Sequence, residues 1–162
     1  MQTNKEMTGQ QAYQKLSALC ARSEHCQQEM LDKMRQWGVS EEEQAQVMAR
    51  LIKEKYVDDS RFARAFVYDK IRYNKWGRRK VEQALWMKHI DESIGQQVLD
   101  EVDDKEYLQI LRPMLRQKQR SIKGGSEYER SMKLIKFAIG RGFTMNLIRQ
   151  CMEVNDENEF PD

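Results

Sequence analysis

Few residues in this chain of 162 have side chains suited to catalysis or metal binding. The cysteines and histidines are Cys20, Cys26, Cys151, His25 and His89. Cys20, His25 and Cys26 are close in sequence, but they lack zinc-site spacing and no second ligand pair follows, so we interpret them as ordinary helix residues. Gly124-Gly125-Ser126 has no following Lys-Ser or Lys-Thr and is not a phosphate-binding loop. We therefore expect no enzyme activity, no metal and no cofactor.

Composition excludes several further classes of protein. Hydrophobic residues make up 40% of the chain, which is too many for a disordered protein with a net charge of only +2. No apolar run approaches the roughly 18 to 20 residues of a membrane span, and residues 1–6 lack the apolar core of a secretory signal. Three cysteines cannot all pair with one another. We therefore expect a protein of the reducing cytoplasm that does not bind membranes.

Charged residues that could bind an anionic partner are segregated along the chain. Two basic stretches, 61–88 and 105–136, flank an acidic stretch, 91–104. The candidate binding residues are Arg61, Arg64, Arg72, Lys75, Trp76, Arg78, Arg79, Lys80, Arg112, Arg116, Lys118, Arg120 and Lys123. For Arg61 and Arg64, on one face of a predicted helix, the alternative is solvation or pairing with nearby acids. Patches of both signs could meet phosphates and a charged protein together.

The segment from Trp76 to Lys80 combines an aromatic residue, a glycine and three cations. Trp76 either packs over a junction between modules or stacks on a nucleic-acid base. Gly77 is expected to begin a helix and to leave the first amides available to a phosphate. Arg78, Arg79 and Lys80 would then occupy a first turn, where cations oppose the helix dipole. Three cations at an unfavourable place indicate an anionic partner, and the alternative is a solvated charged turn.

Helices must position these residues, because apolar residues recur at helical spacing along nearly the whole chain and no segment alternates like a strand. Helix starts are predicted at the capping residues Ser23, Ser40, Asp58 or Asp59, Asp91, Ser126 and Thr144. Ser40 and Glu43 have the spacing of a capping box. Gly38 and Gly142 are predicted to end helices by adopting the left-handed conformation.

A weak repeat of about fifty residues organises the predicted helices. Val39, Ile90 and Phe143 each follow a helix end and precede a helix cap, and we call them the anchor residues. Positions nine and five before each anchor, and eight after it, are apolar or nearly so: Met30, Met34, Val47, Val81, Leu85, Val98, Leu134, Ala138 and Cys151. This is the pattern that a shared helix–turn–helix core requires.

We interpret the repeat as an all-α, elongated array of three tandem three-helix modules. The predicted modules are 1–57, 58–103 and 104–162, the last with an acidic tail. Each module is small, so neighbours should stack and bury apolar surface between them. The alternative is an irregular helical bundle in which the spacing is accidental.

The second module carries a family resemblance. The segment 55–67, KYVDDSRFARAFV, and then 75–81, KWGRRKV, Ala84-Leu85 and Lys88-His89-Ile90 resemble the signature of the RecX family, bacterial modulators of the recombinase RecA. The resemblance spans roughly residues 12–152 and is looser in the first and third modules. Lys55 and His89 stand where the family usually has glycine, and each makes a left-handed helix cap costlier by around 1 kcal/mol.

The motif residues also have structural interpretations. We expect Tyr56, Phe62 and Phe66 in the core, and Asp58 or Asp59 as the cap of the helix that follows, with partner contact as the alternative for the two acids. The other motif residues with structural roles are Gly77, Val81 and Leu85.

The resemblance implies a non-enzymatic regulator that binds RecA and its filament on single-stranded DNA. Such a protein restrains the ATPase, strand-exchange and co-protease activities of RecA, and so modulates DNA repair, recombination and the SOS response. The residues add a mechanism: basic surfaces at 72–80 and 112–123 would approach DNA phosphates or acidic protein, and the acidic stretch 91–104 would face basic protein. Weak contacts connected in one chain add through effective concentration. We expect a monomer with weak direct DNA binding.

Two other functions remain open at this point. Three-helix units permit a direct DNA-binding helix-turn-helix transcription regulator, although no helix shows the mixture of Asn, Gln and Arg expected for base recognition. A passive scaffold is the third possibility, and it would leave the ATPase of RecA unchanged.

Overall fold

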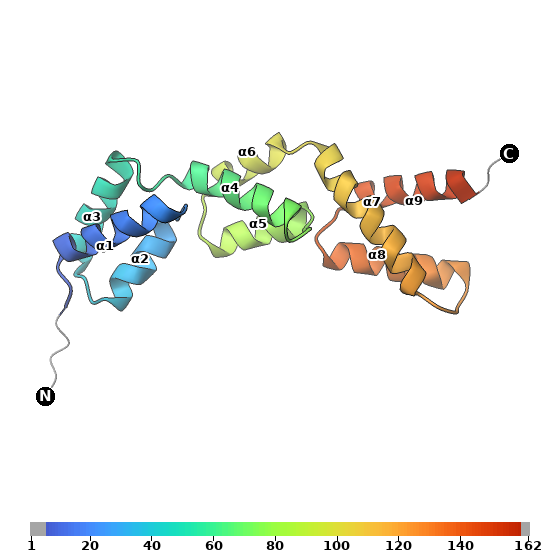
Figure 1. Cartoon of the computed structure of the whole chain (residues 1–162), viewed down its shortest axis with the longest axis horizontal. Coiled ribbons are helices and arrows are strands. Elements are labelled where there is room, and N and C mark those ends of the chain that lie inside the picture. The colour runs from blue at the N-terminus through green and yellow to red at the C-terminus, as the bar shows by residue number, and fades with distance from the viewer. Residues whose placement is uncertain (1–5, 160–162) are drawn as a thin grey trace, which may run out of the picture. The chain divides into compact units, whose positions relative to one another are not determined.

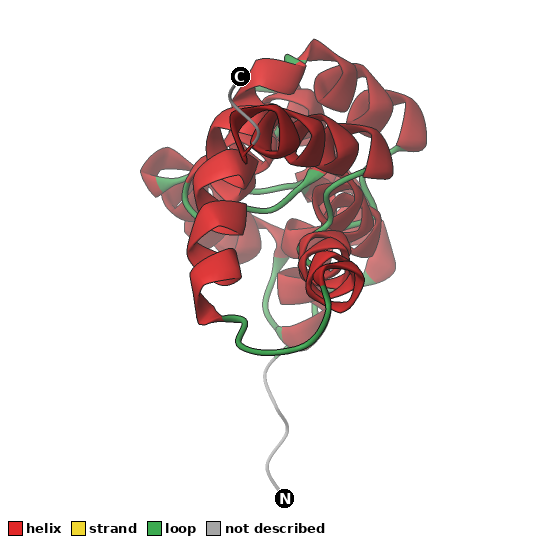
Figure 2. Cartoon of the chain, turned by 90° about the vertical axis from the view of Figure 1, so that its right-hand side faces the viewer, coloured by secondary structure: helices red, strands yellow, loops and turns green. Residues whose placement is uncertain are grey.

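The computed structural model describes the backbone of residues 6–159 and the side chains of residues 6–152. Within these residues the chain forms nine helices and no strand (Figures 1 and 2), which confirms the predicted all-α fold. The helices are α1 (Gly9–Arg22), α2 (Gln27–Gln36), α3 (Glu41–Lys53), α4 (Asp59–Arg72), α5 (Arg78–Met87), α6 (Glu92–Glu101), α7 (Asp104–Ser121), α8 (Glu127–Gly140) and α9 (Met145–Glu159). None of the helices in the described part is long and apolar enough to cross a bilayer.

The apolar positions of the repeat predicted from the sequence are buried in the core. The anchors Val39, Ile90 and Phe143 are 4%, 7% and 1% exposed, and the nine other repeat positions are buried as well. Each anchor amide bonds a carbonyl five residues earlier, on Met34, Leu85 and Ala138 respectively. The same helix–turn–helix core is therefore built three times along the chain.

The chain folds into two compact units, and the boundary between them passes through the middle module. The first unit contains the residues up to Phe66 together with Leu85–Gly95, and the second contains Val67–Ala84 and the residues from Gln96 onwards. Each of the helices α4, α5 and α6 therefore contributes one end to each unit.

In the first unit, α1 packs along α3 and α2 completes the group (Figure 1). The core consists of Ala12, Leu16, Met30, Met34, Val39, Val47, Met48, Leu51 and Val57. Glu43 ties α3 to α1, because its carboxylate accepts a hydrogen bond from the Gly9 amide at the start of α1. The predicted capping box is therefore only half formed: Ser40 Oγ accepts from the Glu43 amide at 3.2 Å, but the Glu43 carboxylate serves α1 instead of its own helix.

In the second unit, α7 packs against both α8 and α9, which also contact each other. The buried side chains of α7 are Tyr107, Leu108, Leu111 and Leu115, and those of the two following helices include Leu134, Ala138, Leu147 and Ile148. This three-helix group carries the second basic stretch of the sequence.

Most of the predicted helix boundaries are confirmed. Ser40 and Ser126 cap α3 and α8, while Asp58 and Asp91 accept main-chain amides at the starts of α4 and α6. Gly38 and Gly142 have φ of 72° and 95°, so both helix ends are left-handed as expected.

Ser23 is not a helix start. It follows the end of α1, and α2 begins four residues later, after Cys26. The capping position of α2 is Cys26, which has no hydroxyl, and the Glu29 carboxylate accepts from the Cys26 amide at 3.0 Å. Asp59 is likewise not the cap of α4, since its carboxylate accepts from the Gln27 amide of α2 at 2.9 Å.

Candidate nucleic-acid interface

The start of α5 is held against the turn between α8 and α9. The Gly77 amide donates to the Arg141 carbonyl at 2.8 Å, and the Arg79 amide donates to the Gly142 carbonyl at 3.0 Å. A Cβ on Gly77 would overlap with the main chain of Gly142 and Phe143, so only glycine permits this approach. The expectation that these amides are open to a phosphate is therefore wrong for Gly77 and Arg79, because the turn already supplies their acceptors.

Trp76 lies directly before this contact, between two lysines. The Lys70 and Lys80 Nζ atoms are 5.2 and 4.7 Å from the centre of its ring, and the ring is half-buried. These cation–π contacts hold the indole in place. The lysines add positive charge beside the ring, and both interpretations of Trp76, packing over a junction and stacking on a base, stay predictions.

A second aromatic ring with two cations lies in α8, just before the same turn. Lys118 Nζ and the Arg141 guanidinium are 5.1 and 5.0 Å from the centre of the Phe137 ring. Arg141 belongs to both groups, because its carbonyl accepts from Gly77 while its side chain covers Phe137. Arg141 therefore links a segment of the first basic stretch to the ring that Lys118 of the second stretch also contacts. We call the set Lys70, Trp76, Lys80, Lys118, Phe137 and Arg141 the cation–aromatic surface.

Sequence reasoning identified only half of this surface. Lys70, Phe137 and Arg141 were not among the candidate residues, because Phe137 has the spacing of a core residue and Arg141 belongs to a helix end. Lys70 lies beside Trp76 for a local reason, because the Trp76 amide donates to the Lys70 carbonyl at 3.1 Å. Only the tertiary contact with Gly77 links Arg141, and through its side chain Phe137, to this segment. Tyr73, which was also missed, is 80% exposed at the end of α4.

Several predicted binding cations are engaged within the protein. Arg78 pairs with Asp100 at 2.7 Å and with the Gln96 amide oxygen at 3.0 Å, which compensates its unfavourable place in the first turn of α5. Arg72 pairs with Glu106 at 3.1 Å.

Arg61 is also held internally, because it bonds Glu24 at 2.7 Å and the carbonyls of Lys55 and Tyr56 at 3.0 and 3.2 Å. These contacts give Arg61 a structural role beside any part in binding.

The remaining candidates differ in exposure. Those exposed to solvent are Arg64, Lys75, Arg79, Arg116, Arg120 and Lys123, whereas Lys118 is half-buried. Arg112 is half-buried on α7, next to the buried Cys151. Lys75 and Arg79 are next in sequence to Trp76 and Lys80 of the cation–aromatic surface. Arg116 and Arg120 lie on α7 and Lys123 just after it, whereas Arg64 lies on α4 in the first unit.

The motif residues occupy mostly structural positions. Phe62 is 6% exposed and stacks on the half-buried Phe66 with 5.5 Å between ring centres. Tyr56 is half-buried and meets Tyr13 edge-on at 6.4 Å. Val81 and Leu85 are buried in the core.

The three thiols are not activated for chemistry. Burial raises the pKa of Cys20, of Cys26 to about 11, and of Cys151, so each stays protonated at neutral pH. Among the described residues, no group of three His, Cys, Asp or Glu side chains is placed to hold a metal ion. The cation–aromatic surface places positive charge beside aromatic rings.

Comparison with known proteins agrees with the threefold organisation. Models of the first, second and third three-helix domains of RecX match residues 12–51, 58–99 and 104–152. The chain is 32% identical to the regulatory protein RecX of Prosthecochloris aestuarii over 80% of its own length and 83% of that protein. It is 28% identical to the RecX of Oceanobacillus iheyensis over 84% of its length, and it spans half the length of that relative.

Solved structures show the same fold. The crystal structure of RecX from Lactobacillus salivarius aligns with a TM-score of 0.85 at 18% identity, covering 91% of this chain and 96% of that one. A second crystal structure of a regulatory protein RecX aligns with a TM-score of 0.82 at 17% identity, covering 90% of this chain and 73% of that one. With three family domains matched in order along most of its length, the chain belongs to the RecX family of regulatory proteins.

Proposed function

We propose that this protein is a non-enzymatic regulator that binds RecA and the filament of RecA on single-stranded DNA. By binding, it restrains the ATPase, strand-exchange and co-protease activities of RecA, and so modulates DNA repair, recombination and the SOS response. It acts in the cytoplasm as a monomer and needs no cofactor. Membership of the RecX family supports this role, and the observation that carries the mechanism is the cation–aromatic surface.

The surface suits a nucleoprotein partner for two reasons. Lysine and arginine side chains placed together neutralise phosphates and release counterions, which gives binding without sequence preference. The exposed ring of Tyr73, close in sequence to Trp76, offers a face on which a base could stack. High affinity for a filament comes from several such weak contacts made by one chain.

The test is the ATPase of RecA on single-stranded DNA, titrated with the protein at two salt concentrations. The key variant is Lys80→Glu, which reverses a charge of the surface in the first turn of α5, where an acid suits the helix dipole and the fold is retained. We expect about tenfold weaker inhibition, the effect of losing one charge-assisted contact.

The matched control is Lys105→Glu, the same substitution in the first turn of α7, among the acids Asp103, Asp104 and Glu106. It should inhibit like the wild type. Equal inhibition by Lys80→Glu and the wild type would contradict a role for the surface. Tight binding to duplex DNA without any effect on RecA would instead favour a transcription regulator, and filament binding without any change in ATPase would favour a scaffold.

A further inference from the structure

The second helix of each module ends in a left-handed turn with an outward main-chain carbonyl. The residues with positive φ are Gly38, His89 and Gly142, at 72°, 57° and 95°. The residues before them are Trp37, Lys88 and Arg141, and the carbonyl of each accepts a hydrogen bond from outside its own helix pair. We call these three segments the docking turns.

Two docking turns receive equivalent segments of the preceding module. In the second unit, the Arg141 carbonyl accepts from the Gly77 amide at 2.8 Å. In the first unit, the Lys88 carbonyl accepts from the Cys26 thiol at 3.8 Å. Cys26 and Gly77 both lie thirteen positions before the anchor residue of their own module and directly before its second helix. One docking contact is therefore used twice.

The two contacts differ in closeness for a physical reason. At Gly142 the turn has no side chain, and the Gly77 carbonyl oxygen lies 2.9 Å from the place where a Cβ would be. At the equivalent position, His89 carries a side chain, and the contact is made by a thiol instead of a main-chain amide. A glycine at the turn is thus associated with direct approach of a main chain.

The docking turn of the first module is also occupied, although no module precedes α1 among the described residues. The Met7 amide donates to the Trp37 carbonyl at 3.2 Å. The main chain of Glu6 covers Gly38, since a Cβ there would lie 3.7 Å from the Glu6 Cα. Gly77 contacts Arg141 and Gly142 in the same way. In the first module the contact is made by the short segment that precedes α1.

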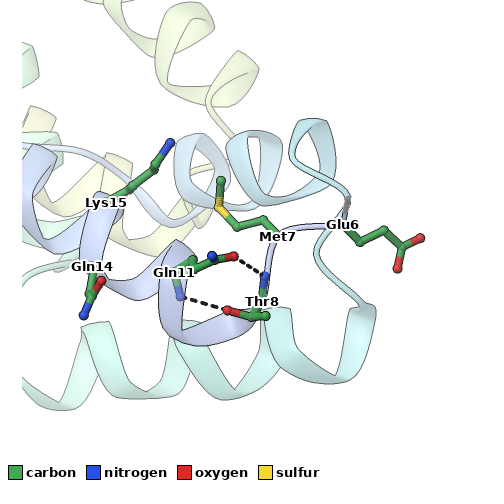
Figure 3. A pocket seen from close by; sticks show the side chains of 6 residues that line it. All are labelled: Glu6, Met7, Thr8, Gln11, Gln14 and Lys15. Atoms are coloured by element: carbon green, nitrogen blue, oxygen red, sulfur yellow. Dashed lines mark hydrogen bonds between the residues drawn. The ribbon is translucent and has the colours of Figure 1, made fainter. Parts of the chain in front are cut away.

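Local contacts hold this segment in place. Figure 3 shows the reciprocal capping box at the start of α1, in which the Thr8 amide donates to Gln11 Oε1 at 3.0 Å and the Gln11 amide donates to Thr8 Oγ1 at 3.2 Å. Met7 packs against the core of the first unit. An open hollow of about 600 Å³ lies beside it, lined by Glu6, Met7, Thr8, Gln11, Gln14 and Lys15.

We propose that Glu6–Met7 is a strap that takes the place of a preceding module and closes the docking turn of the first one. In stacked arrays each repeat buries the face that it turns to its neighbour, and among the described residues Glu6–Met7 supplies this cover for the first module. The third module has no segment for passing the contact on, because the residue thirteen positions before Phe143 is Arg130, which lies inside α8. Within the part of the chain that the structure describes, the docking contact is thus closed at the first module by Glu6–Met7 and is not passed on by the third.

The test uses the full chain and amide hydrogen exchange at Gly38 and Val39, whose amides bond within the docking turn. Met7→Pro removes the amide that donates to Trp37, whereas Met7→Ala keeps it and removes only the side-chain packing. We expect exchange at the turn to become at least about tenfold faster in Met7→Pro and to stay within about threefold of the wild type in Met7→Ala.

The Gly77 amide is an internal reference, since it lies in the other unit and should keep its exchange rate in both variants. Unaltered helix content by circular dichroism would show that α1 still forms. The proposal is overturned if Met7→Pro and Met7→Ala exchange alike at Gly38 and Val39. It is also overturned if the Met7 amide of the wild type exchanges as fast as an unprotected one.

Discussion

Three residues with side chains adopt a backbone conformation that favours glycine. They are Lys55, Lys75 and His89, with φ of 65°, 60° and 57°. The family resemblance drew attention to Lys55 and His89, and the structure confirms the left-handed turn at both. The resemblance does not single out Lys75. Its left-handed conformation belongs to the turn before α5, and this turn places Gly77 against Arg141 of the third module.

The strain at Lys55 leads to a prediction about stability. Lys55→Gly should raise the free energy of unfolding by about 1 kcal/mol, because glycine adopts the left-handed conformation without a Cβ clash. Its carbonyl, which accepts from Arg61, is unaffected by the substitution. Urea unfolding measures the change. Lys53→Gly, two residues earlier at the end of α3, should lower stability by about 0.5 to 1 kcal/mol, so a decrease in both variants would contradict the strain.

Phe62 is the motif residue whose loss should cost the most. It is buried and stacks on Phe66. Phe62→Ala should lower the free energy of unfolding by about 3 to 5 kcal/mol, because it empties a core position. Thermal or urea unfolding checks this, with Ala65→Ser on the exposed face of α4 as a near-neutral comparison. A melting temperature equal to that of the wild type would show that Phe62 is not part of the core.

At the scale of helices, the start of α5 shows how one element positions the candidate interface. Gly77 allows the main chain to reach the turn between α8 and α9, and this contact links the segment that carries Trp76 to Arg141, whose side chain covers Phe137. The helices themselves could be predicted from local periodicity. Their docking could not, because it depends on main-chain hydrogen bonds between residues about sixty positions apart in sequence, which leave no periodic signal.

Gly77→Ala tests this contact. The added Cβ would overlap with the main chain of Gly142 and Phe143, so the start of α5 must move away from the turn. We expect a loss of about 2 to 4 kcal/mol in unfolding free energy, the scale of overpacking together with lost main-chain hydrogen bonds. Gly140→Ala is the matched control: no atom lies within 4 Å of its Cβ position, and alanine should stabilise α8 by about 0.5 to 1 kcal/mol. Similar effects of the two substitutions would contradict the docking contact.

The corresponding contact in the first unit depends on charge. Glu29 bonds the Cys26 amide, lies 3.3 Å from Lys88 Nζ and lies 3.6 Å from His25. Partial burial alone would raise the pKa of Glu29, but the Cys26 amide, Lys88 and His25 outweigh it and hold that pKa below 4.5. For Asp59, burial raises the pKa above 3.8 even though the Gln27 amide acts against it.

These opposite shifts predict opposite effects of pH. A lowered folded-state pKa gives stability that is present above the unfolded-state pKa of about 4.5 and is lost as pH falls through the folded-state value. Glu29→Gln should therefore reduce the loss of stability on acidification from about pH 6 to about pH 3. Asp59→Asn should increase that loss, because a raised pKa contributes stability at low pH. The measurement is the free energy of urea unfolding of the wild type and the two variants across this pH range. Parallel curves of unfolding free energy against pH would contradict the opposite pKa shifts of Glu29 and Asp59.

For the molecule as a whole, the sequence predicted the repeated core but not the way charges gather on its surface. Burial at the anchor spacing is a local property of amphipathic helices, so every repeat position could be identified. The contact of Lys118 with Phe137 is tertiary, and the internal pairing of Arg78 depends on Asp100 and Gln96 of α6. Charge counting along a sequence does not distinguish a cation paired within the fold from one available to a partner.

That distinction sharpens the prediction for the first turn of α5. Replacing Arg78, Arg79 and Lys80 together with alanine removes cations that oppose the helix dipole, so circular dichroism should show the same helix content. Inhibition of the RecA ATPase on single-stranded DNA should weaken, mainly through the exposed Arg79 and through Lys80 beside Trp76. Arg78→Ala alone should inhibit nearly as well as the wild type, because Arg78 already pairs with Asp100. Unchanged inhibition by the triple variant would contradict binding through this turn, and a single-variant effect as large as the triple would show that the Arg78–Asp100 pair opens on binding.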